Sequence, residues 1–235
     1  DKPYNEFVRE QCARHTNLLF GASINPYRKD ALERLALEAS RGAKLVKWLP
    51  NIQLIDAADP RLAPFYRKLH ELRLPLLIHT GSEHSFTTSQ DELGDPDRLR
   101  LALEEGVTVI AAHAASFGRT QNQPNMDRLF ALAERYPNLY IDISAMTQIN
   151  RAGHLRKLLR RKDVRERLVY GTDMPLLETP LVCPWYSLFT LGPWKVLKLF
   201  QEKNPWDRDV LYKKALGVPD EVFYRSAQLL IGAAD

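Results

Sequence analysis

Short apolar runs alternate with longer amphipathic stretches along this chain of 235 residues. The runs begin near residues 18, 44, 75, 107, 139 and 168, and turn-forming residues bound most of them. Between two runs, apolar residues recur at helical spacing, as at Leu32, Leu35, Ala36 and Ala39. A repeat of roughly 26 to 32 residues is the length of one strand and one helix in a parallel sheet. The pattern therefore predicts six βα units.

Cap residues predict where the helices begin and end. Asp30 is expected to cap a helix with Glu33 as its capping partner. Asp59-Pro60 and Asp95-Pro96 combine a capping Asp with a Pro at the first helical position. Gly42 stands where a left-handed residue ends a helix.

Length and composition indicate a single globular domain over residues 1–235. The chain is 45% hydrophobic and 26% charged, and α/β barrels often exceed 200 residues as one unit. Its two cysteines lie far apart and give no disulfide framework, so a reducing compartment, the cytoplasm, is expected. No apolar stretch is long enough to span a membrane, and no signal peptide is visible, so no membrane partner is expected.

The positive charge is concentrated in one segment. The chain carries a net charge of +4, whereas residues 151–167 hold eight Arg or Lys and only two acids. We interpret this segment as a helix with a solvated outer face. A nucleic-acid partner is not expected, because no aromatic residues interleave with the basic ones.

Three apolar runs lead into residues that bind metals or move protons. Leu76 to Ile78 precedes His79, Val109 to Ala112 precedes His113, and Asp173 follows the run that ends in Gly171-Thr172. Parallel α/β folds build their chemistry at the carboxyl ends of the strands. An imidazole there can bind a metal or exchange a proton, and a carboxylate can ligate a cation or accept a proton from water. We expect these three residues to have functional roles.

Other candidates have more than one interpretation. Lys47 lies inside an apolar strand, where it neutralises a substrate anion, becomes a carbamylated metal ligand, or extends to the rim. His84 follows the His79 strand and either lines the substrate site or lies on a surface loop. The aromatic segment from Cys183 to Trp194 forms a wall or lid over the site, or packs against the last helix.

These segments together resemble the amidohydrolase superfamily, and in particular its amidohydrolase-2 branch of metal-dependent TIM-barrel hydrolases and decarboxylases. The motifs that carry the resemblance follow in chain order: Ala43-Lys-Leu-Val-Lys47, Leu76-Leu-Ile-His79-Thr-Gly, Ile110-Ala-Ala-His113-Ala, Asn138-Leu-Tyr-Ile-Asp142 and Val169-Tyr-Gly-Thr-Asp173-Met-Pro. The resemblance implies a (β/α)8 TIM barrel of the metal-dependent hydrolase type, with six βα units visible in this chain.

The resemblance also implies roles for the matching residues. His79 corresponds to the metal-binding histidine of the fifth barrel strand. His113 corresponds to the sixth-strand histidine, which is a metal ligand in some members and an acid or base in others. Asp173 corresponds to the eighth-strand aspartate between metal and hydrolytic water, and Lys47 to the fourth-strand lysine. The implied cofactor is a divalent metal, Zn²⁺ first, with Mn²⁺ or Fe²⁺ as alternatives.

One departure from the family pattern is large. The family's first strand carries a His-x-His pair, and this chain contains none. We expect that N-terminal βα units of the natural protein are missing from this sequence.

The leading hypothesis is a metal-dependent hydrolase of an amide, lactone or ester bond in a small molecule. Metal-activated water attacks, Asp173 is the general base, and His113 stabilises or protonates the intermediate. The alternatives are a non-oxidative decarboxylase of an aromatic or enol acid on the same scaffold, and a metal-free, non-catalytic remnant that binds a ligand or partner. A homo-oligomer is compatible with the sequence.

Overall fold

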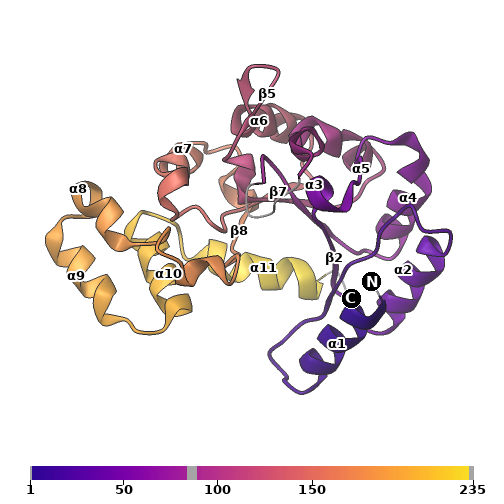
Figure 1. Cartoon of the computed structure of the whole chain (residues 1–235), viewed down its shortest axis with the longest axis horizontal. Helices are drawn as coiled ribbons and strands as arrows, with labels where there is room; N and C mark the ends of the chain where they lie inside the picture. The colour runs from indigo at the N-terminus through magenta and orange to yellow at the C-terminus, as the bar shows by residue number, and fades with distance from the viewer. Residues whose placement is uncertain (1, 84–88, 233–235) are drawn as a thin grey trace. The chain divides into compact units, whose positions relative to one another are not determined.

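The computed structural model describes residues 2–83 and 89–232, in which parallel strands alternate with helices (Figure 1). The chain divides into two compact units, residues 1–140 with 229–235, and residues 141–228. The single domain expected over residues 1–235 stays a prediction. Among the described residues, no helix is both long enough and apolar enough to cross a bilayer.

The first unit contains a parallel sheet whose strands pair in the order β1-β2-β3-β4. These strands are β1 (Gly21–Ala22), β2 (Leu45–Trp48), β3 (Leu76–His79) and β4 (Val109–Ala112). A small antiparallel hairpin, β5 (Arg119–Thr120) and β6 (Gln123–Pro124), follows β4. The helices are α1 (Lys2–Ala13), α2 (Ala31–Ser40), α3 (Pro50–Gln53), α4 (Ala63–Glu71), α5 (Arg100–Glu104) and α6 (Asn125–Arg135). The unit ends in the first residues of β7 (Leu139–Asp142).

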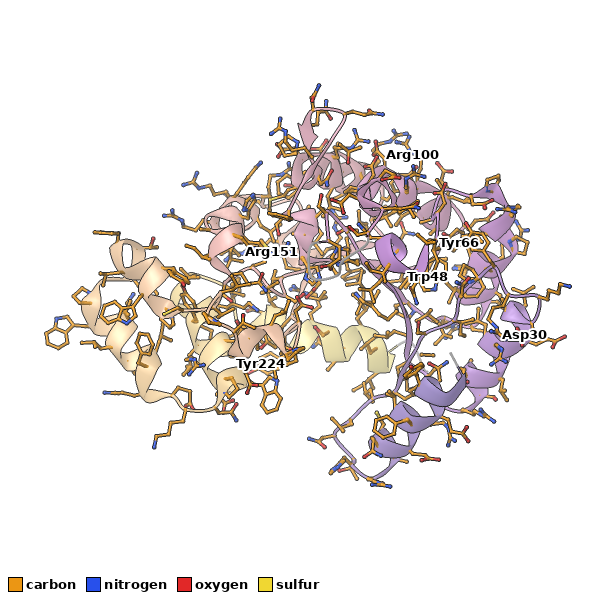
Figure 2. The ribbon with its side chains drawn as sticks, in the orientation of Figure 1. Asp30, Trp48, Tyr66, Arg100, Arg151 and Tyr224 are labelled. Atoms are coloured by element: carbon orange, nitrogen blue, oxygen red, sulfur yellow. The ribbon has the colours of Figure 1, made fainter. Side chains whose placement is uncertain are left out.

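The two faces of this sheet have different neighbours. The Trp48 ring lies 5.4 Å from the Phe65 ring and 6.0 Å from the Tyr66 ring, both on α4 (Figure 2). Successive side chains of a strand point to opposite faces, so Lys47 lies on the other face of β2. Lys47 pairs in register with Leu77, and His79 follows two residues later on β3. Lys47 and His79 therefore share the face of the sheet that does not pack on α4.

The second unit begins within β7, which pairs in parallel with β8 (Leu168–Val169). Its helices are α7 (His154–Leu159), α8 (Leu188–Leu191), α9 (Pro193–Gln201), α10 (Pro205–Ala215) and α11 (Glu221–Ile231), the last of which ends in the first unit. The Ser226 hydroxyl on α11 accepts a hydrogen bond from the Tyr170 amide (3.0 Å) and donates one to the Tyr170 carbonyl (2.7 Å). This bond pair fixes α11 to the chain just after β8.

Several predicted boundaries are confirmed. The Asp59 and Asp95 side chains accept hydrogen bonds from backbone amides two residues on, at the starts of 3-10 helices. Gly42 has a φ of +92°, the left-handed conformation expected after a helix. The prediction for Asp30 is right in position but wrong in mechanism. Its carboxylate makes no cap bond and instead binds Arg28 and Arg34.

The predicted long basic helix over residues 151–167 is wrong. Only His154–Leu159 forms an α-helix there. Gly153 directly before it has a φ of +83°, and a 2.7 Å ion pair between Arg161 and Asp163 stabilises a turn after it. The aromatic segment from Cys183 forms a 3-10 helix, α8 and the start of α9, and the ring of Trp185 lies 5.7 Å from that of Phe200.

Arg128 of α6 fixes the chain that follows β3. Its guanidinium is 8% exposed and donates two 2.9 Å hydrogen bonds to Asp95 and one of 2.7 Å to Asp97. The hydrogen bonds that Arg128 donates to Asp95 raise the pKa of Arg128 above its usual value. Because Asp95 also caps the next helical turn, this ion pair joins two successive βα units.

We expect Arg128→Met to lower the free energy of unfolding by about 3 kcal/mol, because the buried Asp95 carboxylate loses its counter-charge. Urea denaturation measures the change. The matched control is Arg100→Met, whose 3.7 Å ion pair with Asp97 is exposed and should be worth less than about 1 kcal/mol. Equal losses in the two variants would contradict this account.

Candidate functional site

Two buried histidines lie side by side at the carboxyl ends of β3 and β4. His79 is the last residue of β3 and is 3% exposed, whereas His113 directly follows β4 and is 5% exposed. Their ring centroids are 5.1 Å apart, and the ring planes meet at 61°. The strand register pairs His79 of β3 with Ala112 of β4. His113 is therefore one residue further along the chain than the residue paired with His79. The sheet thus brings two sequence-predicted site residues together.

A carboxylate that the sequence reasoning missed stands beside this pair. The Glu83 Oε2 atom lies 3.6 Å from His79 Nδ1, and the Glu83 side chain is only 11% exposed. This distance is longer than a hydrogen bond, so the carboxylate acts on the imidazole through its charge. The sequence predicts a substrate-binding role for His84 in the same loop, and His84 lies outside the described residues.

The loops that hold the histidine pair are hydrogen-bonded to one another through their backbones. The Gly81 amide donates to the Gly94 carbonyl (2.8 Å), and the Ser82 amide donates to the Phe117 carbonyl (3.1 Å). The buried Asn51 side chain on α3 donates to the Gly81 carbonyl (3.1 Å). Segments after β2, β3 and β4 are therefore connected directly, which restricts the motion of the site.

Glycine is required where these loops approach most closely. Gly118 has a φ of +87°, and a Cβ atom there would lie 2.0 Å from the Ser82 hydroxyl oxygen. Gly94 leaves no room either, since its Cβ would lie 2.1 Å from the Gly81 carbonyl oxygen. Any larger residue would force the loop after β3 away from its neighbours.

The chain turns through a strained conformation at His113. His113, Ala114 and Ala115 have φ angles of 59°, 51° and 46°, which place three successive non-glycine residues in the left-handed region. Such residues cost on the order of 1–3 kcal/mol each and concentrate at functional sites. The Thr80 hydroxyl donates a 2.7 Å hydrogen bond to the Ala112 carbonyl just before the turn. The strained turn directs the chain, and with it His113, out of the strand.

Lys47 is half-buried on the sheet face that His79 also occupies. A lysine there can neutralise an anion bound at the carboxyl edge of the sheet. The predicted substrate-binding role of Lys47 remains a prediction.

Asp173 and a second aspartate belong to the second unit. Asp142, at the end of β7, is 5% exposed, and its carboxylate accepts bonds from the backbone amide (3.0 Å) and the hydroxyl of Ser144. A Cβ atom on Gly171 would lie 2.7 Å from the Asp142 carboxylate, so glycine is needed there. Asp173 is half-buried with a φ of +60°. Asp142 formed part of a sequence motif but was not predicted as a site residue.

A buried ion pair supports the chain just after β8. Lys213 on α10 is fully buried and donates to Asp209 (2.6 Å) and to the Gly171 carbonyl (3.3 Å). Asp209 also accepts bonds from Tyr170 (3.0 Å) and Thr147 (3.1 Å). Burial, reinforced by the Asp209 charge, raises the pKa of Tyr170 well above its usual range, so its hydroxyl stays protonated and donates.

The described residues do not complete the metal site that the sequence predicts. Two imidazoles lie together in the first unit, but no group of three His, Cys, Asp or Glu side chains within residues 2–83 and 89–232 is arranged to hold a metal ion. Catalytic zinc sites typically use three protein ligands. The divalent metal that the sequence predicts therefore stays a prediction.

Comparison with known proteins identifies a matching family and solved structures of similar fold. Residues 2–190 match a family model described as Amidohydrolase. No curated protein matches the chain. Among solved structures, an uncharacterized TIM-barrel protein, Bb4693 from Bordetella bronchiseptica, is 19% identical with a TM-score of 0.66, over 98% of this chain and 72% of that chain.

Two further structures carry names that state an activity. A putative 2-pyrone-4,6-dicarboxylic acid hydrolase from Pseudomonas putida is 16% identical with a TM-score of 0.65, over 98% of this chain and 78% of that chain. A 2,6-dihydroxybenzoate decarboxylase from Rhizobium is 13% identical with a TM-score of 0.52, over 80% of this chain and 72% of that chain. At these identities the likeness shows the fold, and the predicted α/β fold of the TIM-barrel type is confirmed.

The close contact at Gly118 gives a stability test of the loop arrangement. Gly118→Ala should lower the free energy of unfolding by about 3 kcal/mol or more, because backbone strain and the contact with Ser82 add. Gly153→Ala is the matched control, since Gly153 has a similar φ of +83° but nothing within 4 Å of its Cβ position. It should lose only about 1 kcal/mol from strain. Urea denaturation in which both variants lose the same amount would contradict the close contact between the loops.

Proposed function

Because the chain belongs to the amidohydrolase family, we propose that it is an enzyme that hydrolyses a C–O or C–N bond of a small molecule. Candidate bonds are those of a lactone, an ester or an amide. The observation that supports this most is the buried His79–His113 pair at the carboxyl edge of a parallel sheet, where such folds place their chemistry. The fold likeness to a putative hydrolase of 2-pyrone-4,6-dicarboxylic acid is in keeping with it.

In the proposed mechanism, side chains position water and move protons. Asp173, whose role rests on the sequence, is the general base that accepts a proton from the attacking water. His113 protonates the leaving atom as the bond to the carbonyl carbon breaks. His79 lies in ring contact with His113, and the Glu83 carboxylate lies 3.6 Å from the His79 Nδ1 atom. Lys47 neutralises a carboxylate or other anion of the substrate.

A decarboxylase is the second candidate. It is favoured by the fold likeness to 2,6-dihydroxybenzoate decarboxylase and to a 5-carboxyvanillate decarboxylase, which has a TM-score of 0.53 and is 12% identical over 97% of this chain and 71% of that chain. In this reaction the carbon that loses carbon dioxide gains a proton, for which His113 or Asp173 would be the donor. A cytoplasmic location and a homo-oligomeric state stay predictions from the sequence.

An isotope experiment separates the two reactions. The protein is incubated in ¹⁸O-labelled water with a panel of lactones, esters, amides and aromatic carboxylic acids, and both product mass and carbon dioxide are measured. Hydrolysis places one ¹⁸O atom in the organic product, whereas decarboxylation removes carbon dioxide and leaves an organic product without ¹⁸O. We expect the label, with kcat/KM reduced by about 100-fold or more in His113→Ala because a proton donor is lost.

The control for that variant is His70→Ala, which removes a histidine that is bonded to the Gly106 carbonyl and lies outside the pair. It should retain the activity of the unaltered protein. Release of carbon dioxide with no ¹⁸O in the organic product would favour the decarboxylase and contradict the hydrolase. Equal activity of the two variants would contradict the role of His113.

The predicted divalent metal has its own test. Elemental analysis of the purified protein should find about one divalent ion per chain, with zinc the first expectation, if a full set of three protein ligands forms. His79→Ala should lose that ion, whereas His70→Ala should keep it. A metal-free protein would contradict the cofactor prediction and would favour the non-catalytic alternative if turnover is also absent.

A further inference from the structure

A cavity lies entirely within the second unit. It has a volume of about 110 Å³ and is bounded by the segment after β7 and by residues of α7, α8 and α10. Its lining includes none of His79, His113 and Asp173, although Tyr186, Ser187 and Thr190 belong to the aromatic segment from Cys183 to Trp194. Its function is therefore a separate question from that of the histidine pair.

Gln148, one of the residues that line the cavity, carries a buried donor. Gln148 is 3% exposed, and its side-chain nitrogen has no hydrogen-bond partner among the described residues. Leaving such a group unsatisfied costs roughly 1–3 kcal/mol. Because native proteins rarely leave a buried polar group unpaired, an acceptor that enters the cavity is the expected partner.

A pair of hydroxyl groups supplies a second donor. The Ser187 Oγ and Tyr212 Oη atoms lie 2.6 Å apart, and both residues line the cavity. One hydroxyl proton makes the bond between them, which leaves the other proton for a ligand. Burial raises the pKa of Tyr212, so the phenol keeps its proton.

The charge around the cavity favours an anion. Arg156 is exposed and lines the cavity, and the described lining contains no acidic side chain. Thr147, also in the wall, contacts Asp209, but the buried Lys213 compensates that charge at 2.6 Å. An acceptor-rich anion would therefore meet donors and positive charge without an opposing carboxylate in the wall.

We propose that this cavity binds the carboxylate group of a small organic acid. Gln148 and the Ser187–Tyr212 pair donate hydrogen bonds to its oxygens, and Arg156 supplies the counter-charge. An engineered cavity of about 150 Å³ holds benzene, so a volume of about 110 Å³ accommodates a carboxylate with a short alkyl group. Apolar side chains in the wall, Met146 and Leu155 among them, suit that alkyl group. The proposal does not depend on the reaction proposed above.

The test is a titration of the ¹⁵N-labelled full chain with sodium acetate at constant ionic strength, followed by NMR. The Gln148 side-chain amide signal, identified by its loss in Gln148→Leu, should shift saturably with a dissociation constant on the order of 1–10 mM, as expected for so small a ligand. Arg156→Met should weaken binding about tenfold, which corresponds to loss of one charge-assisted contact. Arg160→Met, an exposed arginine that does not line the cavity, should bind as the unaltered protein does.

Acetamide, which has nearly the same shape without the charge, should bind at least about tenfold more weakly if a carboxylate is recognised. No saturable shift of the Gln148 signal in the unaltered protein would overturn the proposal. So would equal binding of acetamide and acetate, or equal effects of the two arginine substitutions. If Gln148→Leu does not fold, the two arginine variants are compared through any amide signal that shifts saturably with acetate, which does not require that assignment.

Discussion

The parallel register of β2, β3 and β4 determines which side chains can meet in the first unit. Packing of Trp48 against α4 assigns one face of the sheet to the helices, and the pleat then assigns Lys47 and His79 to the other face. A shift of one residue in register would reverse both assignments. The register also places Ala112 beside His79, so that His113 emerges next to it.

Rigid surroundings hold these side chains where the register puts them. Backbone hydrogen bonds connect the loops after β3 and β4, and Gly94 and Gly118 allow contacts that any side chain would prevent. The strained turn at His113 is maintained by this support, as expected of a preorganised site. In the second unit, the buried Lys213–Asp209 pair has the corresponding role after β8.

The sequence predicts well the strands that lead to His79 and His113. An apolar run indicates a buried strand, and a histidine after its last residue marks the carboxyl end of that strand. It does not predict Glu83, because a carboxylate four residues beyond a strand is placed by loop hydrogen bonds that leave no periodic signal. The sequence does not predict the role of Lys213 either, because a lysine on an amphipathic helix is expected on the solvent-exposed face, whereas Lys213 is fully buried. The long basic helix fails because Gly153 adopts a left-handed conformation before α7, and the chain turns again after Leu159, where Arg161 pairs with Asp163.

In the proposed mechanism, His79 and His113 form one reaction centre. A double-mutant cycle on kcat/KM, with His79→Ala, His113→Ala and the double variant, tests it most directly. Residues that act as a unit are strongly non-additive, so the double variant should be about as impaired as the worse single variant. Losses that simply add would indicate that the two histidines act independently, and unchanged activity in all three variants would contradict the account.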